Sequence, residues 1–70
     1  MSSQRNVLLK ALLAHAAGEI EMSRANIEVY LNASVGIGEH ADITGAIAGE
    51  LDKIARYEDQ IQVLDKYFKA

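Results

Sequence analysis

Apolar residues recur at intervals of three and four along both halves of this chain, and this spacing limits the fold more than any other feature. Such intervals place side chains on one face of an α-helix. In the first half, the row consists of Leu9, Leu13, Ala16, Ile20, Ser23, Ile27 and Tyr30. In the second half, the apolar residues on one side are Ile43, Ile47, Leu51, Ile54, Ile61, Leu64 and Phe68, flanked by Tyr57 and Tyr67. No segment follows the two-residue period of a strand for long, so the pattern predicts an all-α fold.

A single glycine-containing segment, NASVGIGEHADITG, separates the two halves. Gly36 and Gly38 tolerate the positive φ angles that a helix end and a chain reversal require. We therefore predict one helix over about 3–31, a turn over about 32–38 and a second helix over about 39–68, with Asn32 as a left-handed stop. A connection this short makes the helices antiparallel neighbours, so the chain is expected to form a single helical-hairpin domain.

The position of the turn also predicts a register. If the turn centres near residue 35, the numbers of facing residues total about 71. This register places Ala16 opposite Ala55 and Ile20 opposite Leu51.

Two glycines one turn apart, Gly45 and Gly49, give the second predicted helix a smooth strip. Glycine inside a helix costs about 1 kcal/mol relative to alanine, so the strip requires a packing reason. We expect it to admit a closely packed helix, either from the same chain or from a second copy.

Each predicted helix carries a wider apolar stripe than one neighbouring helix covers. A hairpin of two helices therefore leaves apolar side chains in water, which favours self-association. We expect a two-fold dimer of hairpins that forms a four-helix bundle. A larger helical assembly or capture by a different protein is the alternative. The expected interface consists of Leu8, Leu12, Met22, Val29, Tyr57, Leu64 and Phe68.

Composition limits the classes of partner. The formal net charge is −3, and the seven basic residues are scattered among ten acidic ones, which argues against nucleic acid and anionic membranes as partners. No run of about 18 uncharged apolar residues is present, so no membrane-spanning helix is expected. The chain lacks cysteine, which fits a reducing, cytoplasmic location.

The segment VGIGEH does not match a phosphate-binding loop. A P-loop needs Lys and Ser or Thr after its glycines, and a dinucleotide fingerprint needs a third glycine after a strand. Glu39 and Asp42 also place negative charge where an anion would bind. We therefore interpret the segment as a turn and expect no cofactor.

Among possible ligand sites, a metal site is a more specific alternative than a phosphate-binding loop. The candidate ligands are His15, Glu19, Glu50 and Glu58, but the Glu-x-x-His motif of di-metal four-helix bundles is missing. No spacing brings a His and a carboxylate to Ser23, and a solid bundle offers no cleft. The sequence therefore predicts a protein that is not an enzyme, with no metal as the preferred interpretation.

The segments NIEVYLNASVGIGEH, DITGAI and ELDKIARYEDQIQVLDKYF resemble a group of short uncharacterised proteins of tailed bacteriophages, including phages of marine bacteria. The likeness covers roughly residues 7–68, and VGIGEH is its most specific part. It implies a phage origin, hence the host cytoplasm, and implies no activity or functional residue.

Together these features favour a noncatalytic phage-type accessory or assembly protein that acts through helix-mediated protein–protein contacts. A metal- or small-ligand-binding helical bundle and an inhibitor of a host protein are the alternatives.

Overall fold

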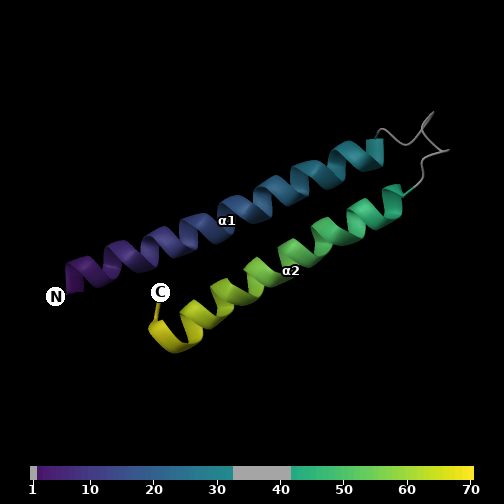
Figure 1. Ribbon diagram of the computed structural model, residues 1–70. Helices are drawn as coiled ribbons and strands as arrows, with labels where there is room; N and C mark the ends of the chain where they lie inside the picture. The colour runs from purple at the N-terminus through teal and green to yellow at the C-terminus, as the bar shows by residue number, and fades with distance from the viewer. Residues whose placement is uncertain (1, 33–41) are drawn as a thin grey trace.

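The computed structural model describes residues 2–32 and 42–70, which contain two long helices and no strand. Helix α1 spans Ser2–Asn32 and helix α2 spans Ile43–Phe68. The helices lie antiparallel and side by side, and both chain termini lie at one end, called here the open end (Figure 1). The predicted all-α hairpin is thus confirmed for these residues. The predicted glycine turn, apart from Asn32, lies outside them.

The start of α2 differs from the predicted start near residue 39. Asp42 is the N-cap, so the helix begins at Ile43. The Oδ1 atom of Asp42 accepts a hydrogen bond of 3.1 Å from the backbone N–H of Gly45. An Asp side chain satisfies a free N–H at a helix start and also complements the helix dipole, which fixes the boundary there.

Helix α2 ends at Phe68 as predicted, and α1 ends one residue later than predicted, at Asn32. Asn32 is the last helical residue of α1 rather than a left-handed stop, and its Nδ2 donates to the carbonyl of Glu28 at 2.7 Å. The left-handed residue is Lys69 at the end of α2, with φ 61°, and its N–H donates to the Asp65 carbonyl at 3.3 Å. The arrangement at Lys69 satisfies a carbonyl group that a helix end leaves free.

The seam between the helices contains the predicted row of α1. Every member is buried or half-buried, and the fully buried ones are Ala16, at 0% exposed, and Ser23, at 2%. Side chains this small at two points one heptad apart let the helix backbones approach closely. The prediction for α1 is confirmed.

The row of α2 is only partly as predicted. Leu51, a member of the predicted row, is 53% exposed, and Phe68, which the sequence also places in the expected interface, is 47% exposed. Glu50 and Tyr57 take inward positions instead. The half-buried row reads Ile43, Ile47, Glu50, Ile54, Tyr57, Ile61 and Leu64, with Ala46 beside it. The members of this row follow one another at alternating steps of four and three residues. This spacing determines which residues face α1, and it places Glu50 rather than Leu51 in the seam.

The register is shifted from the prediction by one or two residues. The Nη2 atom of Arg5 donates to the Phe68 carbonyl at 2.8 Å, and the ring of His15 contacts that of Tyr57. The numbers of these facing residues total 73 and 72 rather than about 71. The predicted partner of Ala16, Ala55, is exposed.

The two glycines of the predicted strip are both exposed rather than buried in the seam. A Cβ atom at Gly49 would meet no other atom within 4 Å, whereas one at Gly45 would overlap the carboxylate of Asp42. The absence of a side chain at Gly45 therefore leaves room for the cap of its own helix. Whether Gly49 faces a second copy stays a prediction.

The complete burial of Ala16 in the seam gives a first prediction. Ala16→Leu should destabilise the fold by about 1–3 kcal/mol because the added side chain has no room in the seam. Ala17→Leu, the same change at the exposed neighbouring position, should stay within about 0.5 kcal/mol of the wild type. Thermal unfolding followed by circular dichroism measures both. Equal melting temperatures for the two variants would contradict the seam described here.

The glycines give a second prediction. Gly18→Ala should stabilise the protein by about 1 kcal/mol, because a Cβ there lies in open space and alanine favours the helix. Gly45→Ala should gain little, because displacing the Asp42 carboxylate costs about 1 kcal/mol of capping energy. Urea unfolding compares the two variants, and an equal gain in both would show that the cap contributes nothing.

Candidate interaction surface

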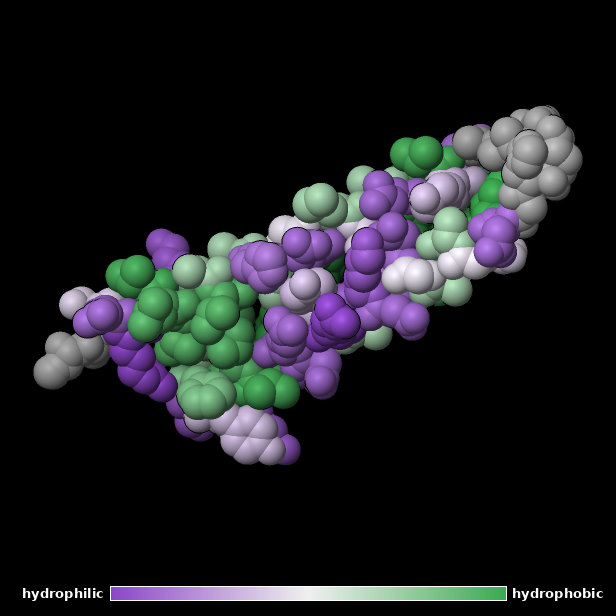
Figure 2. All heavy atoms as spheres, in the orientation of Figure 1, coloured by the Kyte–Doolittle hydropathy of each residue, from purple (hydrophilic) through white to green (hydrophobic). Residues whose placement is uncertain are grey.

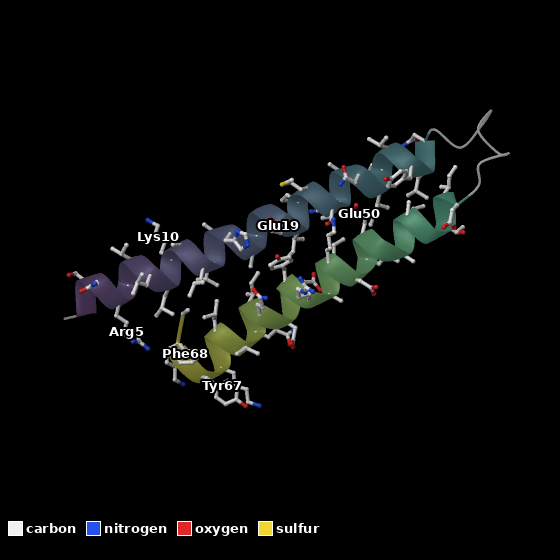
Figure 3. The ribbon with its side chains drawn as sticks, in the orientation of Figure 1. Arg5, Lys10, Glu19, Glu50, Tyr67 and Phe68 are labelled. Atoms are coloured by element: carbon white, nitrogen blue, oxygen red, sulfur yellow. The ribbon has the colours of Figure 1, made fainter. Side chains whose placement is uncertain are left out.

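One carboxylate, that of Glu50, lies in the seam between the helices (Figure 3). Its side chain is 12% exposed, and its Oε2 lies 3.7 Å from the Nζ of Lys53. Its Oε1 is enclosed and has no hydrogen-bond partner of good geometry among the described residues. Ser23 is the buried polar residue of α1 at this level. A polar pair thus interrupts an otherwise apolar seam.

The surroundings of Glu50 favour its charged form. The Ser23 hydroxyl has the largest effect in lowering the pKa of Glu50 below its ordinary value of 4.5, opposed by burial. The Asn26 amide and the Lys53 ammonium also lower this pKa. Glu50 is therefore an anion at neutral pH, which suits a structural charge better than a proton donor.

The four candidate metal ligands do not come together. Glu50 lies in the seam, Glu19 is half-buried, and His15 and Glu58 are exposed. Over 2–32 and 42–70, no group of three His, Asp or Glu side chains is arranged to hold a metal ion. His15 instead packs edge-on against Tyr57, with ring centroids 5.5 Å apart and ring planes at 81°. This geometry is typical of packing between aromatic rings.

The open end carries a cluster of exposed apolar side chains, which we call the open-end patch. Figure 2 shows apolar atoms gathered at this end and a hydrophilic band across the middle of the hairpin. The members, all between 39% and 64% exposed, are Leu8, Leu12, Val63, Tyr67 and Phe68. An apolar cluster of this kind, bordered by polar residues, is typical of a protein interaction site.

Two rows of exposed or half-exposed residues flank the seam on one face of the hairpin. The α1 flank row has alternating steps of four and three and comprises Leu8, Leu12, His15, Glu19, Met22, Asn26 and Val29. The α2 flank row follows the same spacing and comprises Gly49, Lys53, Arg56, Gln60, Val63 and Tyr67. A shallow groove of about 210 Å³ is lined by residues of both rows, Leu12, Gln60 and Val63, together with Asp59 and Leu64. Because residues of both rows line the same groove, the two rows lie on one face of the hairpin, called here the groove face.

The predicted interface residues divide between this surface and the seam. Leu8, Leu12, Met22 and Val29 are 52–63% exposed and belong to the α1 flank row. Phe68 belongs to the open-end patch. Tyr57 and Leu64 are half-buried within the hairpin, so little of either is left for a partner. Their role in an oligomer stays a prediction.

The interface predicted from the sequence does not include Val63 and Tyr67, which belong to the α2 flank row. Both continue the α2 flank row at the same spacing as the α1 flank row. This repeat is the sequence pattern that places them on the same face of α2. The signal is weak in the sequence because the other members of the row are polar or glycine.

Comparisons add no relative: no family model, curated protein or solved structure matches this chain. Neither of the two described helices has a stretch long and apolar enough to cross a bilayer.

The position of Glu50 gives a third prediction. Because its pKa is lowered in the folded protein, its charge stabilises the fold above the unfolded-state pKa, and this contribution is lost as the pH falls through the folded-state value. The free energy of unfolding should therefore decrease less steeply in Glu50→Gln than in the wild type as the pH falls below about 4.5. Urea unfolding between about pH 7 and pH 3 measures the slope.

Glu58→Gln is the matched control, because Glu58 is an exposed residue of the same helix. It should keep the wild-type slope. Identical slopes for all three proteins would mean that the seam contributes nothing to the acid sensitivity.

Proposed function

We propose that this chain is a noncatalytic accessory or assembly protein that acts through helix-mediated protein–protein contacts, beginning with its own dimerisation. The surface of the single hairpin carries the proposal. A compact monomer of this mass would expose roughly 4,300 Å², whereas this chain exposes 5336 Å². The excess of about 1,000 Å² is similar to the roughly 800 Å² that each partner contributes to a standard interface.

The exposed side chains support the same proposal. Ten large apolar side chains are 39–65% exposed, whereas the fully buried residues of the described chain are Ala16 and Ser23. Covering part of this surface with a second hairpin stabilises by about 25 cal/mol per Å² of apolar area removed from water. A four-helix bundle of two hairpins is the simplest closed arrangement that does so.

The resemblance to short tailed-phage proteins gives this proposal its biological setting, the cytoplasm of an infected host. Binding of a metal or small ligand is less well supported, because a ligand site in a helical bundle draws on clustered inward carboxylates. Among the described residues of the seam, Glu50 is the inward-facing carboxylate.

A fourth prediction tests self-association. The wild-type protein should sediment as a dimer at micromolar concentration, and its melting temperature should rise with concentration because association stabilises the folded state. Leu12→Asp should weaken the dimer by removing apolar area from the open-end patch. Sedimentation equilibrium and light scattering measure both effects.

Leu51→Asp is the matched control, because Leu51 is as exposed as Leu12, at 53% against 52%, but lies outside both flank rows. It should leave the dimer intact. A stable, folded wild-type monomer at high micromolar concentration would overturn the proposed function.

A further inference from the structure

The residues of the groove face change in character along its length, from apolar at the open end to charged in the middle. Leu8 and Leu12 lie at the open end of the α1 flank row, and Glu19 lies near the middle of α1. In the α2 flank row, Val63 and Tyr67 lie at the open end, and the bases Lys53 and Arg56 lie in the middle. One face thus carries an apolar end, an acid at mid-height on one helix and two bases at mid-height on the other.

We propose that a second copy of this chain docks on the groove face with the two open ends together, so that α1 of each copy lies against α2 of the other. This arrangement rests on the proposed function and specifies its first interface. Its two-fold axis runs parallel to the long axis of the hairpin. Both open-end patches are then covered by each other.

The register within the hairpin determines which residues meet in this dimer. The residue numbers of facing positions in α1 and α2 add up to 72 or 73. Glu19 is therefore level with Lys53 and lies within one helical turn of Arg56. Because the two-fold axis keeps each residue at its own height, Glu19 of one copy faces Lys53 and Arg56 of the other. The symmetry repeats these opposite-charge contacts on the other side of the interface.

The same register matches the apolar residues. Leu12 lies within about one turn of Val63, since both line the groove. In the proposed dimer, Leu12 of each copy therefore meets Val63 of the other, and Leu8 meets Tyr67. Towards the far end, Met22 lies at the height of Gly49, where a Cβ would have open space. A large side chain thus faces a vacant position.

Charge disfavours the other two-fold arrangement of the same face. With the open ends apart, α1 would lie against α1 and α2 against α2. Because Glu19, Lys53 and Arg56 lie near the midpoints of their helices, Glu19 would approach its own copy and Arg56 would approach Lys53 of the other chain. Like charges across an interface disfavour a partner, so they select the arrangement with open ends together.

Charge reversal tests the orientation, and it is the fifth prediction. Glu19→Arg and Arg56→Glu should each weaken the homodimer at least about tenfold, because opposite charges become like charges at two symmetric places. An equimolar mixture of the two variants should form a heterodimer of nearly wild-type affinity. Sedimentation velocity at low salt, with one variant carrying a fluorescent label, measures these affinities.

Matched controls reverse the same charges elsewhere. Glu28→Arg and Lys10→Glu change exposed residues outside the flank rows, and Figure 3 shows Lys10 on the side of α1 away from α2. Both controls should dimerise as the wild type does. If Arg56→Glu dimerises more tightly than the wild type while Glu19→Arg is unchanged, the open ends lie apart and this orientation is wrong.

A distance measurement checks the orientation in an otherwise wild-type protein. The chain has no cysteine, so Ser3→Cys gives a unique position for a nitroxide label at the open end. Two labels should lie within about 30 Å if the open ends are together, and about 45 Å or more apart if they are not. A dimer with the longer distance would overturn this inference and leave the proposed function standing, whereas a monomer would overturn both.

Discussion

The structure depends on a narrow seam in which two helices bury one strip of each other. Burial of apolar area is the main favourable term in folding, and a helix pair offers it along a single line of contact. Ala16 and Ser23 let the backbones approach, and the isoleucines and leucines beside them remain half-buried. The hairpin is therefore defined in direction and register but leaves much of its apolar surface in water. Because so little apolar area is buried within the hairpin, the proposed function is argued from the exposed surface of the chain rather than from a cleft.

Polar groups at the ends and middle of the seam fix its geometry. Arg5 reaches the carbonyl of Phe68, which ties the start of α1 to the end of α2 and satisfies a group that the helix end leaves free. Glu50 lies at mid-seam, and one of its oxygens is enclosed and has no hydrogen-bond partner among the described residues. A buried carboxylate is costly if the register slips, because it then loses the groups that favour its charge. These contacts complement the apolar strip, which by itself distinguishes poorly between neighbouring registers.

The groove face unites features that belong to separate parts of the sequence. The open-end patch draws on residues of the two helices that are 51 to 60 positions apart, and the mid-height acid and bases come from different helices. Their placement on one face follows from the antiparallel register. This face carries the proposed dimer, and the opposite arrangement of the same surfaces would bring like charges together.

The sequence by itself determined the class of fold, the existence of two long helices and the buried row of α1. These features follow from local helical periodicity, which requires no knowledge of a partner helix. The row of α2 was partly misassigned because residue type was weighted above period, so that Leu51 was preferred to Glu50. The candidate metal ligands could be recognised by type, but the sequence could not show that no three such side chains form a group among the described residues.

Only the tertiary structure decided the register, the groove and the joining of the two flank rows into one face. A shift of one or two residues changes which side chains meet, and the apolar pattern of each helix is nearly unchanged by such a shift. The helix boundary at Asp42 and the left-handed Lys69 were likewise decided by hydrogen bonds at the helix ends. Periodicity identifies the buried face of each helix, whereas register depends on contacts between residues far apart in the chain.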